Sequence, residues 1–365
     1  MNFLKKKTVV VGMSGGVDSA VTAAILKEEG YNVMGVTLTL WQDEREDEKR
    51  WQDRSCCKVG LARHVARVLE IPHHSVDVQK VFQAEVIDNF AAVYLMGETP
   101  NPCVRCNERI KFGKLLSVAK ELGADFLATG HYARIQFQPD RKRYALYKGV
   151  DPKKDQSYFL YRLSQEQLGA TLFPLGAMNK EAVYQRAVAL GLPYEEVLES
   201  QEVCFVTQKD YRAFLSENHP ESMSPGNIVT ETGETVGEHD GIAFYTIGQR
   251  RGVGVALGER HYVTGLNLLK NEVTVGPESS LFVEKLITKD HVWGGLGIPE
   301  KPICISAKLR YRASEQKAEL SILPDQYASL CFERPQRAVA AGQSAVFYKE
   351  DEVIGGGVIV SLAQE

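Results

Sequence analysis

The most chemically informative stretch of the sequence is Gly12–Ser19, which reads GMSGGVDS and follows a β-branched run. Gly15 and Gly16 let backbone N–H groups approach an anion, and a helix that begins here adds further donors and partial positive charge. Asp18 can cap that helix or hold Mg²⁺. The lysine of the G-x-x-x-x-G-K-[ST] loop is missing. The stretch therefore predicts a phosphate-binding loop that contains no lysine.

The second informative feature is a set of cysteines. Cys103 and Cys106 lie within the stretch 99–107, and Cys204 lies far along the chain. The prolines of that stretch predict an extended loop with a helix soon after it. Thiols near a helix N-terminus and beside arginine side chains have lowered pKa values. We therefore expect Cys103 and Cys106 to be partly thiolate at neutral pH.

Three kinds of site fit Cys103, Cys106 and Cys204. A closed zinc site needs four ligands, and no fourth is evident. Three thiolates can hold an iron–sulfur cluster with one iron left open. Alternatively, two of the thiols are redox partners that shuttle sulfur, one as a persulfide and the other resolving it by disulfide formation. These residues alone leave the alternatives open.

The elements that must position these residues alternate between strand and helix over residues 1–207. Strands are predicted at 8–12, 32–40, 74–78 and 125–130, and helices at 17–29, 58–70, 81–95 and 110–122. This alternation predicts an α/β fold, with an open parallel sheet, helices on both faces and ligands at the carboxyl ends of the strands. A densely charged loop is predicted at 42–54.

From Ile228 onward the pattern changes to short β-branched runs separated by turns, which predicts two small, mostly antiparallel β domains. The predicted turns are at Thr232–Gly233, Asp240–Gly241, Lys270–Asn271 and Gly355–Gly357. We therefore expect three domains: an α/β domain at 1–207, a small central β-rich domain at 208–280, and a C-terminal β-barrel at 281–365.

Composition narrows the class of protein. Of 365 residues, 44% are hydrophobic and 25% are charged, with a formal net charge of −4. These values exclude disorder and an indiscriminate nucleic-acid coat but allow a local RNA site. No apolar run fits a membrane span or a signal peptide, so we expect a cytoplasmic protein with no membrane partner. We interpret Cys56 and Cys57 as structural, and Cys304 and Cys331 as buried.

Several motifs occur in the order in which one enzyme family has them. The stretch Gly12–Ser19 resembles the signature of the N-type ATP pyrophosphatases, the PP-loop enzymes, which cleave ATP between the α and β phosphates. The later motifs are PNPxxxCN at 100–107, TGHYA at 129–133, KDQSY at 154–158, SQEVCF at 200–205, YTIGQRRG at 245–252 and AGQS at 341–344. With them, the chain resembles the bacterial tRNA-specific 2-thiouridylases over nearly its whole length.

The resemblance implies roles for individual residues. It makes Cys106 the nucleophile and Cys204 the carrier of a persulfide, which forms a transient disulfide with Cys106. The residues implied to bind ATP, with Mg²⁺, are Gly12, Met13, Ser14, Gly15, Gly16, Val17, Asp18, Ser19, Leu38 and Gly130. The residues implied to meet the target base are Asn101, Pro102 and Cys103. Those implied to contact tRNA are His131, Lys154, Asp155, Gln156 and Gln343.

The implied reaction is 2-thiolation of the wobble uridine in the tRNA anticodon loop. The uridine 2-carbonyl oxygen attacks the α-phosphorus of ATP, pyrophosphate leaves, and the persulfide on Cys204 attacks the activated carbon. Cys106 releases sulfide or closes a disulfide with Cys204. The implied sulfur donor is a cysteine desulfurase or a persulfide relay protein. A base leaves its stack at little cost in a single-stranded loop.

One residue departs from the family pattern. Many members have Asp where this chain has Cys103. The change creates a Cys-x-x-Cys pair and keeps open a second route, in which Cys103, Cys106 and Cys204 hold a [4Fe-4S] cluster. Two rival functions are an ammonia-using amidotransferase or ligase of the same superfamily, which has no use for the thiols, and a non-catalytic RNA-binding module with a vestigial nucleotide loop.

The stretch 306–312 alternates between cationic and apolar residues. In a strand the cations would share one face and the apolar residues the other. A row of cations at intervals of roughly 6–7 Å suits a phosphate backbone, and the resemblance implies that this domain grips tRNA. We therefore predict tRNA contacts at Lys308, Arg310, Tyr311 and Arg312.

Overall fold

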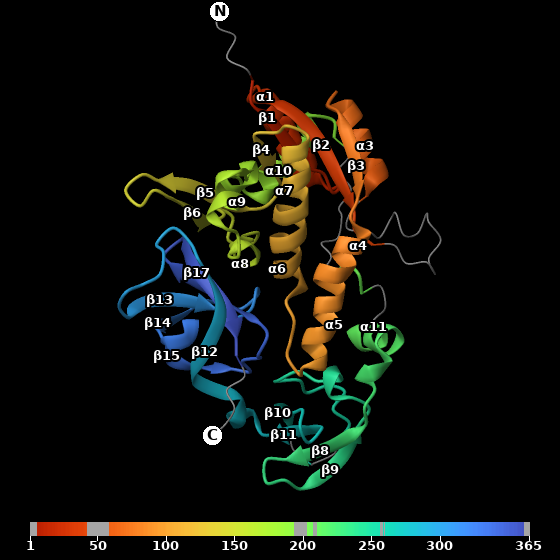
Figure 1. Ribbon diagram of the computed structural model, residues 1–365, viewed down its shortest axis with the longest axis vertical. Helices are drawn as coiled ribbons and strands as arrows, with labels where there is room; N and C mark the ends of the chain where they lie inside the picture. The colour runs from red at the N-terminus through yellow and green to blue at the C-terminus, as the bar shows by residue number, and fades with distance from the viewer. Residues whose placement is uncertain are drawn as a thin grey trace, which may run out of the picture.

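The structure is a computed structural model that describes residues 6–41, 58–192, 203–206, 210–255, 258 and 260–360. The predicted charged loop at 42–54 and the residues Cys56 and Cys57 lie outside the described residues. Figure 1 shows an α/β part near the N-terminus, a small β sheet, and a β-barrel that contains the last strands of the chain.

A five-stranded parallel sheet forms the α/β part, with the strand order β3-β2-β1-β4-β7. Its strands are β1 (Thr8–Gly12), β2 (Asn32–Thr39), β3 (His73–Asp77), β4 (Phe126–Ala128) and β7 (Thr171–Leu172). Because β2 and β4 lie on opposite sides of β1, the strand order reverses at β1. The carboxyl ends of β1 and β4 therefore flank the crevice in which such sheets bind ligands. The predicted parallel sheet is confirmed.

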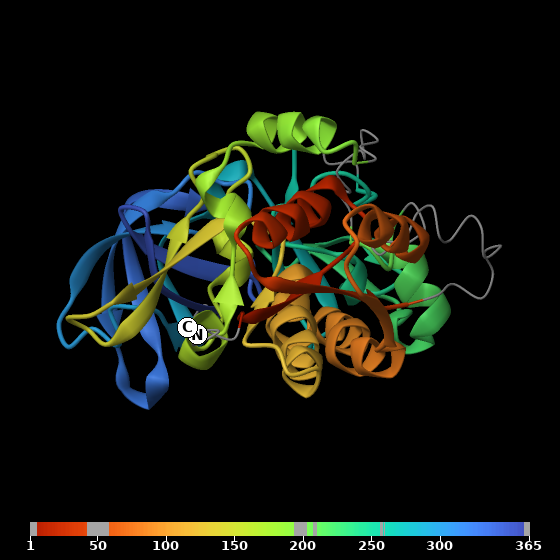
Figure 2. The ribbon, with the colours of Figure 1, turned by 90° about the horizontal axis from the view of Figure 1, so that it is seen from above.

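Helices cover both faces of this sheet (Figure 2). On one face lie α1 (Val17–Glu28), α3 (Val59–Val68) and α10 (Lys180–Ala189). On the other lie α4 (Gln79–Phe82), α5 (Asp88–Leu95), α6 (Pro102–Cys106) and α7 (Leu115–Glu121). The alternation of side chains along β1 explains the two layers, because Val9 and Val11 pack with the first set and Val10 packs with the second.

Two long helices on this second face contain wide π-helical turns. The π segment η1 (Gln83–Ile87) joins α4 to α5, and η2 (Asn107–Lys114) joins α6 to α7. The helix predicted at 110–122 therefore begins at Pro102. Such π segments are common at functional sites.

The sequence predicted an extended loop over 99–107, but only the first residues of this stretch form a loop. The rest belongs to α6 and the first residue of η2. Asn101 is the N-cap of α6, and Pro102 occupies the first helical position. Proline is tolerated there because its missing N–H would have no intrahelical partner anyway. Cys103 and Cys106 consequently lie on the first turns of a helix, and their directions are fixed by it.

The second part is a four-stranded sheet with the order β10-β11-β8-β9. Its strands are β8 (Gly226–Thr230), β9 (Thr235–His239), β10 (Tyr262–Asn267) and β11 (Glu272–Gly276), preceded by the helix α11 (Tyr211–Asn218). The pairs β8–β9 and β10–β11 are antiparallel, whereas β8 and β11 pair in parallel. Turns at Thr232–Gly233 and Lys270–Asn271 join the antiparallel pairs, as predicted.

The third part is a barrel of six strands. They are β12 (Phe282–Trp293), β13 (Ile303–Lys308), β14 (Gln316–Ile322), β15 (Ala328–Arg337), β16 (Ser344–Lys349) and β17 (Glu352–Ile359). The barrel closes because β12 pairs with both β15 and β17. A hairpin of β5 (Ala133–Gln138) and β6 (Arg143–Lys148) adds to β17, so the predicted first domain supplies two strands to this sheet.

Short helices connect the hairpin to the rest of the chain. They are α8 (Ser157–Leu160), α9 (Gln165–Gly169) and the 3₁₀ turn η3 (Pro174–Ala177). Among the helices in the described ranges, none is long and apolar enough to cross a membrane.

Two expectations about the barrel are wrong. The predicted turn at Gly355–Gly357 lies inside β17, where a Cβ on Gly356 would come within 2.5 Å of Tyr161 Cδ2 and 2.8 Å of Ala345 O. These glycines therefore permit close packing rather than a turn. Cys304 and Cys331 are exposed rather than buried. They lie on the outer face of their strands, because the barrel interior takes the alternate residues.

Candidate active site

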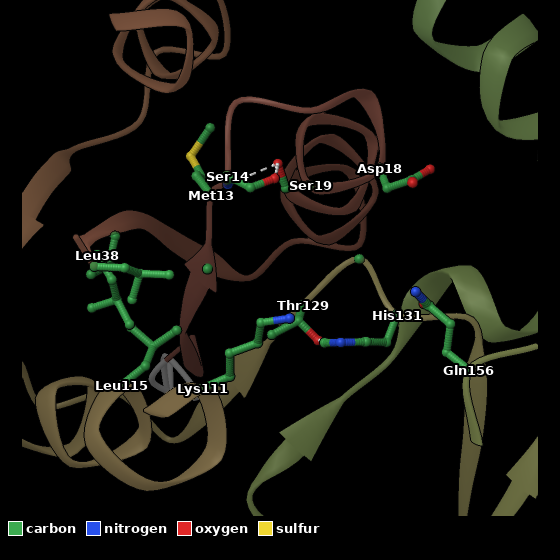
Figure 3. A pocket seen from close by; sticks show the side chains of 14 residues that line it. Met13, Ser14, Asp18, Ser19, Leu38, Lys111, Leu115, Thr129, His131 and Gln156 are labelled. Atoms are coloured by element: carbon green, nitrogen blue, oxygen red, sulfur yellow. Dashed lines mark hydrogen bonds between the residues drawn. The ribbon is translucent and has the colours of Figure 1, made fainter. Parts of the chain in front are cut away.

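A pocket of about 230 Å³ opens at the carboxyl ends of β1, β2 and β4 (Figure 3). Seven of the residues predicted to bind ATP line this pocket: Gly12, Met13, Ser14, Asp18, Ser19, Leu38 and Gly130. Gly15, Gly16 and Val17 belong to the same loop but do not line the pocket. The pocket is also lined by residues that were not predicted to bind ATP: Val36, Leu40, Lys111, Leu115, Thr129, His131 and Gln156.

The pocket is apolar at one end and polar at the other, as Figure 3 shows. The apolar end is formed by Val36 and Leu38, which share one face of β2, by Leu40 just after this strand, and by Leu115 of α7. The alternation of side chains around Leu38 is the sequence signal that would have found Val36 and Leu40. An aromatic base fits the apolar end, and phosphates fit the hydroxyls and backbone N–H groups of the loop at the polar end.

Glycines shape the loop that forms the polar end. Gly15 has φ +83°, and a Cβ there would lie 2.6 Å from Lys58 O. A Cβ on Gly130 would lie 2.9 Å from the backbone of Asp18. Ser19 Oγ accepts a hydrogen bond from Ser14 N at 3.3 Å and donates one to Gly16 O at 2.9 Å. The loop is therefore ordered by its own contacts.

Asp18 is the carboxylate of this pocket. Lys180 Nζ lies 2.7 Å from its Oδ1 and 2.8 Å from its Oδ2, and Tyr132 OH donates to Oδ1 at 2.7 Å. Burial and the neighbouring Asp18 charge raise the pKa of Tyr132, which stays a donor. Nucleotide-bound Mg²⁺ is usually held by phosphates and one or two carboxylates. Asp18 fits that role.

The helix that carries the first two cysteines reaches from its N-cap, Asn101, to the pocket. The Asn101 side chain accepts from Val104 N at 3.4 Å, and its Nδ2 donates to Tyr158 OH at 3.4 Å. Cys103 is exposed and Cys106 is half-buried. Because η2 and α7 continue the same helix, Cys106 is on the element that also supplies Lys111 and Leu115 to the pocket.

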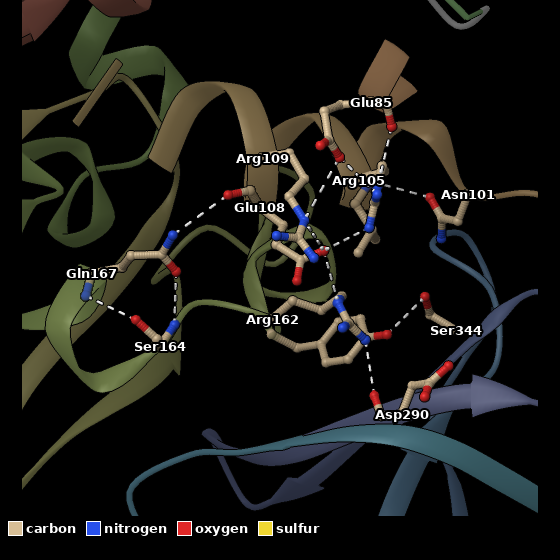
Figure 4. A network of polar contacts seen from close by, with 12 residues as sticks. Glu85, Asn101, Arg105, Glu108, Arg109, Arg162, Ser164, Gln167, Asp290 and Ser344 are labelled. Atoms are coloured by element: carbon tan, nitrogen blue, oxygen red, sulfur yellow. Dashed lines mark hydrogen bonds and ion pairs between the residues drawn. The ribbon is translucent and has the colours of Figure 1, made fainter. Parts of the chain in front are cut away.

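A network of charges surrounds this helix (Figure 4). Arg105 Nη2 lies 2.7 Å from Glu85 Oε2, which joins the helix to η1. Arg162 Nε lies 3.0 Å from Glu108 Oε2, and Arg162 Nη1 donates to the Asp290 carbonyl of β12 at 2.9 Å. The side chains of Arg162 and Glu108 are 18% and 13% exposed, so the pair is better shielded from water than a surface ion pair. The network ties the helix that carries Cys103 and Cys106 to the barrel.

The loop between β15 and β16 of the barrel also hydrogen-bonds to the loop before Asn101. Gln343 Nε2 donates to Thr99 O at 3.1 Å and to Pro100 O at 2.8 Å. Thr99 N donates to Ala341 O at 2.8 Å. Gly342 has φ +83°, and a Cβ there would lie 2.9 Å from Thr99 O. Gln343, which was predicted to contact tRNA, therefore holds the loop that leads to the residues predicted to meet the target base.

Cys204, the third cysteine, is positioned by the packing of its neighbour Phe205. Cys204 is exposed, whereas the next residue, Phe205, is fully buried and packs edge-on against Phe82 at 5.9 Å and Phe90 at 5.2 Å. Cys204 is thus held beside α4 and α5. Among the described residues no group of three His, Cys, Asp or Glu side chains could hold a metal ion. Cys103, Cys106 and Cys204 are therefore not gathered as cluster ligands in this structure.

His131, Asp155 and Gln156, which were predicted to contact tRNA, have partners within the protein. His131 is buried between the Phe112 and Phe173 rings, and its Nδ1 lies 2.7 Å from Thr129 Oγ1. Burial, with Lys111 nearby, lowers the pKa of His131 well below its ordinary value.

Asp155 and Gln156, the other two of these residues, hydrogen-bond to backbone groups near His131 and the hairpin. The buried Asp155 carboxylate accepts from Gly149 N and Ser157 N, each at 3.1 Å, and from Ser157 Oγ at 2.9 Å. Gln156 Oε1 accepts from Tyr132 N at 3.0 Å. Lys154 precedes them, and its role with tRNA stays a prediction.

The predicted cationic strand is wrong beyond Lys308. Strand β13 ends at that residue, and Arg310–Arg312 form a turn in which Ala313 N donates to Arg310 O. The Arg310 guanidinium donates to Ala338 O. Tyr311 packs against Phe159 with ring centroids 4.3 Å apart and ring planes tilted by 38°, and Lys308 Nζ lies 5.5 Å from the centre of the same tyrosine ring. Lys308 and Tyr311 thus meet, although the strand pattern put them on opposite faces.

The match to known proteins covers nearly the whole chain. Residues 7–208 match the model of the tRNA methyl transferase HUP domain, 212–277 that of the tRNA methyl transferase PRC-barrel domain, and 283–359 that of the aminomethyltransferase β-barrel domain. The chain is 44% identical over 362 residues to the tRNA-specific 2-thiouridylase MnmA of Clostridium perfringens, covering 98% of this chain and 100% of that relative. The chain belongs to the tRNA-specific 2-thiouridylase family.

Other thiouridylases match at similar levels. MnmA 1 of Caldanaerobacter subterraneus is 47% identical, with 96% of this chain and 97% of that relative covered. MnmA of Moorella thermoacetica is 46% identical, with 97% and 100% covered. Among solved structures, the U34-tRNA thiolase NcsA of Methanococcus maripaludis with its [4Fe-4S] cluster is 22% identical, with 60% of this chain and 69% of that chain covered and a TM-score of 0.35. That likeness is too weak to carry an argument about a cluster.

Proposed function

We propose that this protein is a cytoplasmic, ATP-dependent sulfurtransferase that converts the wobble uridine of tRNA to 2-thiouridine. The observation that carries the proposal is one continuous helix, α6–η2–α7, which bears Cys106 next to the Asn101 loop and also lines the nucleotide pocket through Lys111 and Leu115. Membership of the thiouridylase family supports the substrate.

The first step is adenylation of the uridine. Its O2 attacks the α-phosphorus, N3 loses its proton, and pyrophosphate leaves, so that a poor leaving oxygen becomes part of AMP. Mg²⁺ bound at Asp18 with the phosphates would supply charge neutralisation. The loop residues Ser14 and Ser19 position the phosphates, and this positioning supplies most of the acceleration.

The second step is sulfur transfer. The terminal sulfur of a persulfide on Cys204 forms a bond to C2, and the C2–O bond to AMP breaks. Cys106 then attacks the Cys204 sulfur, which releases 2-thiouridine and leaves a Cys106–Cys204 disulfide. Alternatively, Cys106 first releases hydrosulfide from the persulfide, and hydrosulfide attacks C2. An external thiol reductant restores both thiols in either case.

The sulfur comes from a protein donor in this proposal. A cysteine desulfurase or a persulfide relay protein would deliver it, and the exposure of Cys204 supports direct transfer between proteins. Family membership also supports Lys154, Lys308, Arg312 and Tyr311 as tRNA contacts. A route through a [4Fe-4S] cluster on Cys103, Cys106 and Cys204 is the alternative.

The test is a reconstituted reaction with unmodified tRNA, ATP, cysteine and a cysteine desulfurase. The wild-type chain is expected to form 2-thiouridine and one AMP for each thiolated base, whereas Cys204→Ser and Cys106→Ser form no 2-thiouridine. The exposed Cys331→Ser is the matched control and should match the wild type. The proteins are purified anaerobically and assayed for iron. A requirement for stoichiometric iron and acid-labile sulfide would replace the persulfide route by the cluster route.

A further inference from the structure

The phosphate loop has no lysine of its own, but a lysine from far along the chain is paired with it. Lys180 Nζ contacts both carboxylate oxygens of Asp18, at 2.7 and 2.8 Å. It comes from the first turn of α10, whose N-cap is Asn179. None of the motifs that identify the family includes Lys180, and the sequence gives no local sign that it reaches the loop.

This lysine is held more firmly than an ordinary surface lysine. Its side chain is only 14% exposed, and its Nζ lies 4.8 Å from the centre of the Tyr184 ring and 5.7 Å from that of Tyr132. By contrast, the side chains of the Lys120–Glu166 pair are 52% and 77% exposed. Removing an ammonium group from water is costly, so a lysine in such a site is expected to have anionic partners there.

The position of α10 is fixed independently of the ion pair. Val183 and Ala187 of this helix are fully buried in the same core as Val21 and Ala24 of α1. The Lys180 backbone N–H also donates to Asp151 Oδ2 at 3.0 Å. The lysine therefore starts from a rigid helix that is packed against the helix following the phosphate loop.

Lys180 and Asp18 together set the charge at the polar end of the pocket. Asp18 lines the polar end, where phosphates of a nucleotide are expected, and its carboxylate would repel them. Lys180 neutralises Asp18 in the nucleotide-free protein. Asp18 would hold Mg²⁺ together with the phosphates, and the Lys180 ammonium would then be available to the phosphates next to it. Charge on departing pyrophosphate is stabilised by such a pre-positioned cation.

We propose that Lys180, which reaches the polar end of the pocket through Asp18, is a phosphate-binding cation there and takes the β,γ-phosphates of ATP, and then pyrophosphate, as its ligands. This inference rests on the proposed use of ATP. The inference predicts that Lys180 contributes to the binding of ATP and pyrophosphate. Lys180 should contribute little to the binding of AMP, because AMP lacks the β- and γ-phosphates.

The test measures equilibrium binding of ATP, pyrophosphate and AMP to the full chain, with Mg²⁺, by calorimetry. Lys180→Met is expected to weaken ATP and pyrophosphate binding at least about tenfold, as loss of a charged hydrogen bond does, and to change AMP binding less than about twofold. Lys180→Arg should recover most of the lost affinity. Lys120→Met, which removes an exposed ion pair, is the matched control and should bind all three ligands like the wild type.

The outcomes are distinguishable. Equal weakening of all three ligands by Lys180→Met would show that the lysine only orders the loop through Asp18, and unchanged binding would show that it does not serve phosphates; either result overturns the inference. Circular dichroism confirms folding, and Lys180→Gln, which also removes the charge, provides the same selective test if Lys180→Met unfolds. If the selective loss is seen but the wild type forms no 2-thiouridine, the proposed function fails and the role of Lys180 stands.

Discussion

Gly130 lies at the carboxyl end of β4, directly against the start of α1. A Cβ at this position would come within 2.9 Å of Asp18 C and within 3.0 Å of Ser19 N, and both neighbours are backbone atoms that cannot turn away. The absence of a side chain therefore lets strand β4 and the phosphate loop meet. The same contact sets how far the two walls of the pocket stand apart.

Substitution at this glycine tests that contact. We expect Gly130→Ala to destabilise the fold by about 1–3 kcal/mol, as overpacking does, and to raise the Kd for ATP at least about tenfold. Gly60→Ala is the control, because a Cβ at Gly60 on α3 meets nothing within 4 Å. Chemical denaturation and ATP titration measure both quantities. Equal ATP affinity in Gly130→Ala and the wild type would contradict the assignment of this pocket to the nucleotide.

Much of this residue-scale detail follows from the sequence, but not all of it. The string of glycines and serines predicts a phosphate loop because few other sites need those residues together. Lys180 leaves no such signal, because its pairing with Asp18 depends on how α10 packs on α1. The exposure of Cys331 depends on which face of its strand the closed barrel turns inward, and a short apolar run does not reveal that face.

At the scale of elements, local patterns predict the strands and helices of the α/β part well. They fail where tertiary contacts determine where an element begins or ends. The predicted strands and helices around β1 are confirmed because strand and helix periods differ clearly there. The start of α6 was missed because two prolines suggested a loop, whereas Asn101 and Pro102 form a cap and a first helical turn.

The predicted cationic strand fails for a different reason. The alternation of residues through 306–312 suits a strand, but hydrogen bonding of β13 to its neighbours stops at Lys308. The turn that follows lets Tyr311 pack on Phe159. Alternation predicts which face a residue takes only while the strand has partners.

At the scale of the whole molecule, both the barrel and the α/β part contact the loop that precedes Asn101. Gln343 donates to the carbonyls of both Thr99 and Pro100, and Tyr158 OH donates to Ser344 O at 3.2 Å. Arg162 joins Glu108 to the barrel carbonyl of Asp290. Contacts between residues so distant in the sequence cannot be found from local patterns. Through these contacts the barrel holds the loop that precedes Asn101, where the target base is predicted to bind.

This coupling predicts a specific defect. We expect Gln343→Ala to lower kcat for thiolation about tenfold, because two hydrogen bonds of about 0.5–1.5 kcal/mol each no longer hold the loop, with tRNA affinity changed less than about twofold. Gln336→Ala, which removes a local contact to the Arg334 carbonyl, is the control. Filter binding and single-turnover thiolation separate the two effects. A loss of tRNA affinity as large as the loss of kcat would make Gln343 a tRNA contact rather than a clamp on the loop.

The central claim is that one enzyme-bound sulfur, carried on Cys204, passes to an ATP-activated uridine. The most direct measurement loads the protein with a radioactive persulfide, removes the donor, and follows the label through a single turnover with tRNA. Label is predicted to move from Cys204 to 2-thiouridine only when ATP is present, with one AMP released per labelled base and no transfer from Cys204→Ser. Label reaching tRNA without ATP, or equally well from Cys204→Ser, would contradict the account.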